Sequence, residues 1–311
     1  MADDISPSWA DAGIELITGT TAVPKALAKL IDVASEYFSL PLAPAKTYLK
    51  VIAEGAAARS KARTESTIKL IKQEGKMSLE ERAEAFEEKR KIRQQANKEA
   101  VILKAAVESV NTDDSHVRND PVDKDWTVSF FDSCKDVGNG DMQTIWARIL
   151  AGEIAKPGSF SLRTLALVKV MSQKDAELFT RFCSFVWHIR GAAYPILPVL
   201  TSGTEIIGAE FVTNQHLDHL GLIRYDPISP FTVESTTDPI PELIFKYFGC
   251  SHCFIPYNKQ AVFTSFVVGP CMLTQIGTEL VSIAGGIADE QYVELIKFHY
   301  QKMGWVLTKC I

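Results

Sequence analysis

The chain has 311 residues, of which 46% are hydrophobic, and this is enough apolar material to bury at least one sizeable core. Lys and Arg number 33 and Asp and Glu number 38, so the net charge of −5 excludes the overall electrostatic footprint of a nucleic-acid or anionic-membrane binder. No run of about 18 apolar residues occurs, which argues against a transmembrane helix. We expect two or three structural units.

The first 110 residues are predicted to form a helical region. Apolar residues recur at helical intervals between Ala26 and Phe38, and Pro41 and Pro44 end that helix. A second helix carries Tyr48 and Ile52, so the two are expected to form a hairpin.

A long charged helix follows the hairpin. Ser78 and Glu81 form the pattern of a capping box, and a helix of about thirty residues is predicted from there to Val110. Apolar positions are sparse until Val101, so the first half should be solvated and the second half should pack on the body. Residues 111–125 are polar and contain proline, which predicts a linker and a domain boundary.

Residues 126–190 are predicted to form a central helical bundle. Asp125 is expected to cap the first helix, and Ser159 or Ser161 to cap a later one that ends near Val170. Ser172 with Asp175 should cap a helix that reaches about Ile189. Six residues of this bundle form an expected structural core motif: Trp126, Trp146, Arg148, Glu153, Ser161 and Arg163.

Three members of this motif, Arg148, Glu153 and Arg163, are expected to form ion pairs across the turn at Pro157-Gly158. The serine hydroxyls nearby can satisfy N–H groups at helix starts. This stretch is therefore interpreted as a scaffold without catalytic residues.

Residues 191–311 are predicted to form a winged-helix-like α+β unit. Strands are expected within residues 196–200, 204–212 and 261–269, and a short helix capped by Thr213 should end at Gly221. Thr274 should cap another helix, Asp289 the last one, and "WVL" at 305–307 should be a final strand. The predicted fold class is mainly α, with this mixed unit at the C-terminal end.

A family resemblance rests on Trp126, Phe130-Phe131, Asp136 and "MQTIWARILAGEIAKPGSFSLRTLALVKVMSQKDAELF". These residues resemble the uncharacterised bacterial family called domain of unknown function 2806, over about residues 120–305. The layout, with "LGLI" and "LTQIGTEL" downstream, is also similar to the abortive-infection alpha family of phage-defence proteins. The resemblance implies the architecture and a bacterial or prophage setting, and it supplies no catalytic residues.

The six cysteines, at positions 134, 183, 250, 253, 271 and 310, lie scattered in a chain too large to need disulfide bonds. Asp3 and Asp4 near the start argue against a signal peptide, so we expect thiols and a cytoplasmic protein. Cys250 and Cys253 have the spacing of a zinc knuckle.

A zinc site would need two further ligands, for which His216 and His219, or else Cys271 or Cys310, are the candidates. No second CxxC occurs, so buried thiols and surface histidines are the simpler interpretation, and neither a metal nor a cofactor is expected. Phe254-Ile255-Pro256 after Cys253 is unlike a thioredoxin-type helix start. GxSxG, P-loop, HExxH and GxGxxG motifs are absent, which leaves a metal-dependent enzyme as the third alternative.

Nucleic-acid binding is the second alternative. Its candidates are five residues of the long charged helix, Lys89, Arg90, Lys91, Arg93 and Lys98, together with the winged-helix-like unit. The presumed recognition helix has Asp218 and neither Lys nor Arg, and the basic residues lie among glutamates as on a solvated helix face.

The leading hypothesis is a non-enzymatic interaction or effector protein, acting by protein binding or by self-association through the N-terminal region. Apolar stripes between Ile5 and Ala58 exceed what the polar segment after them can cover, so we expect a homo-oligomer. A membrane surface is the competing partner. Lys25 and Lys29 beside Asp32 and Glu36 are not the basic face that anionic lipids attract.

Overall fold

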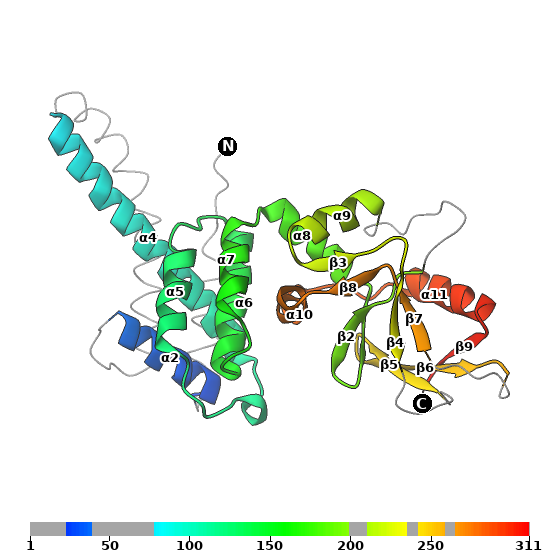
Figure 1. Ribbon diagram of the computed structural model, residues 1–311. Coiled ribbons are helices and arrows are strands. Elements are labelled where there is room, and N and C mark those ends of the chain that lie inside the picture. Colours follow the sequence, from blue (N-terminus) through cyan, green and yellow to red (C-terminus); the bar gives the residue numbers. More distant parts are fainter. Residues whose placement is uncertain (1–22, 39–77, 199–209, 235–241, 259–264, 311) are drawn as a thin grey trace. The chain divides into compact units, whose positions relative to one another are not determined.

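The structure is a computed structural model that describes residues 23–38, 78–198, 210–234, 242–258 and 265–310. The chain divides into two compact units, Met1–Lys169 and Val170–Ile311 (Figure 1). This division does not coincide with the boundaries expected at 110, 125 and 190. The expected helix around Tyr48 and Ile52, and with it the hairpin, lies outside the described residues.

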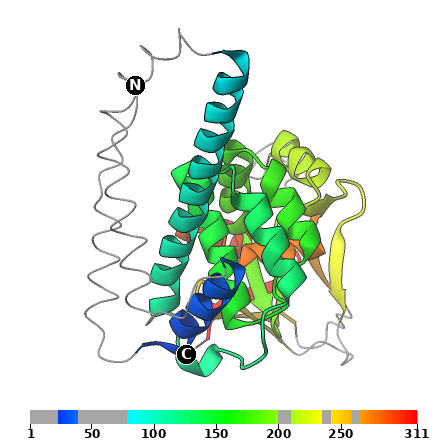
Figure 2. The same ribbon diagram turned by 90° about the vertical axis from the view of Figure 1, so that its left-hand side faces the viewer.

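The described part of the first unit is helical. Its elements are α2 (Lys25–Tyr37), α4 (Leu79–Val110), a short 3₁₀ helix (Asp114–His116), α5 (Lys124–Cys134), α6 (Gly140–Ala155) and α7 (Leu162–Val170). The C-terminal half of α4 packs on α6 and on α2, and its N-terminal half extends past the ends of α2, α5 and α6 (Figures 1 and 2).

The start of α4 confirms the prediction. Ser78 N–H donates to Glu81 Oε2 at 2.7 Å, and Glu81 N–H donates to Ser78 Oγ at 3.2 Å, which is a capping box. The helix has 32 residues, exposed almost throughout its first half. Its second half buries Val101, Ile102, Leu103, Ala105 and Ala106. The apolar residues on this stretch therefore attach α4 to the unit.

The segment predicted to be a linker is held against the first unit. Val117 is buried, and Arg118 N–H donates to the carbonyl of Ala155 at 2.8 Å. Lys25 Nζ donates to the carbonyl of Val117 at 2.7 Å. These contacts explain why a polar, proline-containing stretch joins α4 to α5 within one unit instead of separating two.

Helix caps in the following segment differ by small shifts from those expected. Asp123, and not Asp125, caps α5 and accepts the N–H of Trp126 at 2.7 Å. The helix begins two residues earlier than expected, so Asp125 lies in its first turn. Ser161 accepts the N–H of Thr164 at 3.3 Å at the start of α7, as predicted.

The second unit is built on a five-stranded antiparallel sheet in the order β2-β1-β5-β6-β9. The strands are β1 (Val186–Ile189), β2 (Ala192–Pro195), β5 (Leu243–Tyr247), β6 (Cys250–Pro256) and β9 (Trp305–Lys309). Two strand pairs accompany it: β3 (Ile223–Tyr225) with β8 (Cys271–Leu273), and β4 (Phe231–Glu234) with β7 (Ser265–Gly269). The helices of this unit are α8 (Gln173–Cys183), α9 (Phe211–His219), α10 (Gln275–Val281) and α11 (Glu290–Lys302).

Aromatic side chains fill the core of the second unit. Tyr300 of α11 stacks on Phe266 with ring centroids 4.7 Å apart. Trp187 Nε1 donates to Tyr292 Oη at 3.0 Å, and that hydroxyl donates to the carbonyl of Ile196 at 2.5 Å. Burial alternates along β5, whose residues Leu243, Phe245 and Tyr247 face the core. Alternate side chains of a strand point to opposite faces of the sheet. The sheet therefore packs against α11 with the face that carries these three residues.

Several expected elements of the second unit are corrected. The helix expected to reach Ile189 ends at Cys183, because Val186–Ile189 forms β1 and pairs with both β2 and β5. Phe211 and Val212, expected in a strand, begin α9, whose cap position is Glu210 and not Thr213. Within 196–200, Ile196 to Pro198 are not in a strand, and the rest lies outside the described residues. At Val186–Ile189, tertiary pairing of strands overrides local propensity.

Other predictions for this unit are confirmed. Ser172 with Asp175 caps α8, Thr274 caps α10, and Asp289 caps α11. Residues 305–307 lie in the final strand, β9. The described residues therefore form an α-helical first unit and an α+β second unit.

Candidate interaction surface

The motif between residues 126 and 165 lies largely in the core of the first unit. Trp146 is completely buried, and its ring meets Phe130 edge to face at 5.4 Å. Trp126 Nε1 donates to the carbonyl of Phe160 at 2.7 Å, and Ser161 Oγ lies 3.1 Å from Thr164 Oγ1. The ring contact joins α5 to α6, and the hydrogen bond of Trp126 joins α5 to the residue before Ser161 at the start of α7.

The expected ion pairs across the Pro157-Gly158 turn are replaced by other contacts. The buried carboxylate of Glu153 accepts the N–H of Gly158 at 2.6 Å and that of Phe160 at 3.0 Å. Arg148 Nε instead lies 3.3 Å from Glu108 Oε1 on α4, and Arg163 is exposed. The turn leaves backbone N–H groups inside the unit, and Glu153 satisfies them.

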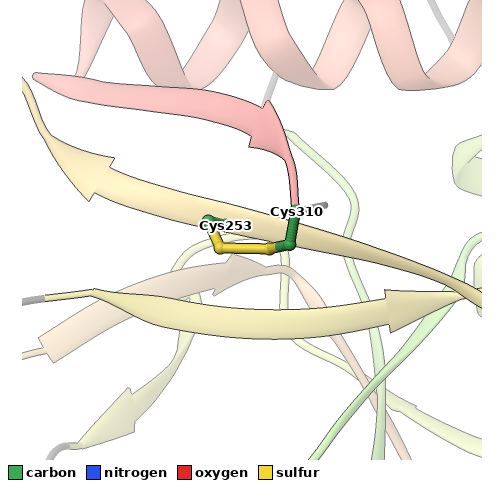
Figure 3. The surroundings of a disulfide bond; sticks show 2 residues. All are labelled: Cys253 and Cys310. Carbon is green, nitrogen blue, oxygen red and sulfur yellow. A yellow bond between two sulfur atoms is a disulfide. The ribbon is translucent and has the colours of Figure 1, made fainter.

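One of the two cysteines of the candidate zinc knuckle, Cys253, is in a disulfide bond. Cys253 of β6 is bonded to Cys310, with their Cα atoms 5.9 Å apart (Figure 3). In the register of β6 and β9, Cys253 lies opposite Thr308, which brings Cys310 alongside it. The expectation of thiols is therefore wrong for this pair, because strand pairing joins two cysteines that are 57 positions apart in the sequence.

The four remaining cysteines are free: Cys134, Cys183, Cys250 and Cys271. Burial raises the pKa of the Cys134 thiol to about 12 and that of the Cys271 thiol to about 12, and it raises the pKa of Cys183 further. These three buried thiols stay protonated at neutral pH.

The histidines named as further zinc ligands lie on α9. His216 Nε2 is 2.7 Å from Asp175 Oδ1, so its ring joins α9 to the start of α8. His219 lies at the last position of α9. Within the described ranges no three His, Cys, Asp or Glu residues lie where they could share a metal ion. The proposed ligands are thus not assembled into one site.

The N-terminal half of α4 exposes both charged and apolar side chains. Leu79 is 70% exposed, Phe86 63% and Ile92 55%. Its charges are divided along the helix, with five Glu and one Arg between 80 and 88 and four Lys or Arg between 89 and 93. We call residues 79–93 the α4 arm. The apolar residues of this arm were missed in the sequence, where only their sparse spacing was noted.

The five basic candidates for nucleic-acid binding do not share one side of α4. Successive residues of an α-helix point about 100° apart, so Lys89, Arg90 and Lys91 point in three directions. Arg90 pairs with Glu87 at 2.9 Å. Lys98 Nζ lies 5.3 Å from the ring centroids of both Tyr37 and Phe38, where it packs against α2. Arg93 belongs to the exposed arm.

No helix in the described ranges combines the length and apolar character needed to cross a bilayer. No curated protein and no solved structure matches the chain. One family model does match, over residues 81–297, from within α4 to within α11. It confirms the resemblance recognised on the stretch from Trp126 to Phe179 and extends it into the α4 arm. The chain belongs to the family described as protein of unknown function, DUF2806.

Proposed function

We propose that this chain is a non-enzymatic interaction protein that acts by self-association, with the α4 arm as the contact surface. The bacterial or prophage setting is proposed from the sequence resemblance to the family of domain of unknown function 2806. A role as an effector in anti-phage defence is proposed from the similarity to the abortive-infection alpha family alone. The contact surface is proposed from the geometry and charge of the arm.

The distribution of charge along the arm favours an antiparallel pair of arms. Residues 80–88 have a net charge of −4 and residues 89–93 a net charge of +4. When two copies lie antiparallel, the acidic segment of each faces the basic segment of the other. A parallel pair would place like charges together. A two-fold axis generates the antiparallel arrangement, because the same patch then meets itself.

The exposed apolar side chains of the arm support the same contact. Leu79 and Phe86 are seven residues apart, so they lie within about 20° of each other on the helix surface. Both are exposed, and a large exposed phenylalanine on a helix otherwise rich in charge is a usual anchor for a partner helix. A second arm would remove both side chains from water.

Self-association is tested by sedimentation equilibrium on the full chain and on charge variants. The variant called all-acidic replaces Lys89, Arg90, Lys91 and Arg93 by Glu. The variant called all-basic replaces Glu80, Glu84, Glu87 and Glu88 by Lys and keeps Glu81, which belongs to the capping box of α4. Each variant alone should be monomeric, and an equimolar mixture should form a dimer. The control exchanges Glu294 and Lys297, an exposed ion pair on α11, and should associate like the wild type.

Orientation is tested by a third variant in which the acidic and basic segments are exchanged. In an antiparallel pair this variant binds itself and not the wild type. Binding to the wild type in preference to itself would establish a parallel pair. A monomeric wild-type chain at all concentrations, or dimers unaffected by these substitutions, would rule out the arm as the contact.

The nucleic-acid alternative concerns both the α4 arm and the second unit. We propose that α9, the β3–β8 pair and α10 form the winged-helix-like part of the second unit and that this part binds protein. Nucleic-acid binding is tested on the same samples as self-association. α9 contains Asp218 and neither Lys nor Arg, and it buries Asn214 and Leu217. Retention on heparin that falls steeply with salt, and that is lost in the all-acidic variant, would replace our proposal with a nucleic-acid binder.

Membrane contact is the remaining alternative. The Nζ atoms of Lys25 and Lys29 donate to the backbone carbonyls of Val117 and Arg118, at 2.7 and 3.2 Å. The ammonium groups of these two lysines of α2 therefore bind backbone carbonyls within the first unit. Flotation of monomeric protein with anionic vesicles would overturn the self-association proposal.

A further inference from the structure

A pocket lies in the second unit between the end of α8, strand β1, the β5–β6 hairpin and α10. Its volume is about 290 Å³. Cys183, Val186, Phe248 and Val281 supply most of its apolar lining, together with Gly249 and Gly286. The volume lies near the lower limit of ligand sites, which span roughly 300–1,000 Å³, so an occupant would be a small molecule.

Two basic side chains complete the lining of this pocket. His188 of β1 and Lys246 of β5 lie opposite each other in the register of the two strands. The lining contains no Asp or Glu, and neither basic residue has an ion-pair partner among the described residues. Two basic residues side by side without a carboxylate favour an anion from outside the chain.

The wall of the pocket includes a strained residue. Phe248 has a φ of +44°, and with Gly249 at +82° it forms the tight turn between β5 and β6. Glycine or asparagine takes the first position of such a turn readily, whereas an aromatic residue does so at a cost. Phe248 is 44% exposed, so burial does not compensate for this strain. Strained residues of this kind cluster at binding sites.

We propose that this pocket binds a small molecule with one anionic group and a flat apolar body. The anionic group lies between Lys246 and His188, and the body lies against Val186, Val281 and the ring of Phe248. The oxygens of carboxylate and phosphate groups accept hydrogen bonds from the ammonium of Lys246 and from an imidazole N–H of His188, and such an anion favours the protonated form of that imidazole. The proposal is independent of self-association, because the α4 arm and the pocket share no residue.

The test uses 2-naphthoate, 2-naphthyl phosphate and the neutral 2-naphthylmethanol as probes of the full chain. Binding is followed by the imidazole NMR signals of the six histidines, and the signal missing from His188→Gln identifies His188. Burial lowers the pKa of His188, so an anion bound beside it should raise the pH at which its signal titrates. Lys246 and Cys183 are the other titratable groups of the lining.

We expect at least one anionic probe to shift the His188 signal and the neutral probe to leave it unchanged. Whichever anion binds more tightly identifies the group recognised. Lys246→Gln should weaken that binding about tenfold or more, whereas Lys174→Gln, at an exposed position of α8, should not change it. Phe248→Asn relieves the strained turn, so this variant should melt higher than the wild type and yet bind more weakly.

The proposal is wrong if neither anionic probe shifts the His188 signal. It is also wrong if the neutral probe binds as tightly as the anions, or if Lys246→Gln binds as the wild type does. A Phe248→Asn variant that melts higher and binds with unchanged affinity would remove Phe248 from the site. These outcomes do not depend on whether the chain forms dimers.

Discussion

The carboxylate of Glu153 accepts the backbone N–H of Phe160 at 3.0 Å, seven residues along the chain and across a proline-glycine turn. The same carboxylate accepts the N–H of Gly158 at 2.6 Å, so one buried side chain closes the connection between α6 and α7. An ionisable group without solvent is costly unless hydrogen bonds compensate for its burial.

Removing this carboxylate should destabilise the first unit. Glu153→Ala leaves two backbone N–H groups without their acceptors, and we expect the free energy of unfolding to fall by about 2–4 kcal/mol. Glu153→Gln keeps one acceptor and should cost less. Asp120→Asn, at an exposed position between α4 and α5, is the control. Urea unfolding measures all three variants, and equal stability of Glu153→Ala and Asp120→Asn would contradict the role of Glu153.

Trp146 provides a second test of the same core. Trp146→Ala should lower the free energy of unfolding by roughly 3–5 kcal/mol, because it leaves a cavity beside Phe130. Nε1 of Trp146 has no hydrogen-bond partner in the described structure, so Trp146→Phe loses packing and no hydrogen bond, and should cost less. Arg163→Ala should stay within about 0.5 kcal/mol, since Arg163 is exposed. Thermal melts of the three variants test this order of destabilisation, and a different order would contradict the prediction.

The disulfide between Cys253 and Cys310 should stabilise the end of the chain. Cys310→Ser is expected to lower the free energy of unfolding by about 2–4 kcal/mol under oxidising conditions, because the bond restricts the unfolded chain. Under reducing conditions the variant and the wild type should unfold alike. Cys250→Ser, at a free cysteine of the same strand, is the control. A peptide map without reductant that lacks the Cys253–Cys310 link would refute this prediction.

Asp175 should make the stability of the second unit depend on acid pH. Burial by itself would raise the pKa of Asp175, but hydrogen bonds from His216 and Ser172 outweigh it and lower the pKa below the usual 3.8. A carboxylate whose pKa is lower when folded stabilises the fold above its unfolded pKa, and this contribution disappears as the pH falls through the folded value. We expect Asp175→Asn to be less stable than the wild type by about 1 kcal/mol near pH 7, and equally stable at about pH 2.

Urea unfolding across this range measures the difference between Asp175→Asn and the wild type. Glu290→Gln, at an exposed position in the first turn of α11, is the control. A constant difference between Asp175→Asn and the wild type at all pH values would show that packing, and not charge, carries the contribution of Asp175.

The local features of this protein could be predicted from its sequence. Ser78 with Glu81 and Ser172 with Asp175 were predicted and are present, since a capping box joins residues three positions apart. The division of α4 into an exposed and a buried half followed from the spacing of its apolar residues. The family was recognised from a continuous stretch of residues, which the family model confirms.

Contacts between distant residues could not be predicted in this way, because they depend on the folded chain as a whole. The pairing of β6 with β9 joins Cys253 to Cys310, and the pairing of β1 with β5 brings His188 to Lys246. Strand pairing also explains why Val186–Ile189, expected at the end of a helix, forms a strand. No short-range pattern encodes these contacts, because strand register depends on which faces of the whole sheet become buried. Helix caps depend on a few neighbouring residues, whereas strand partners depend on the complete core.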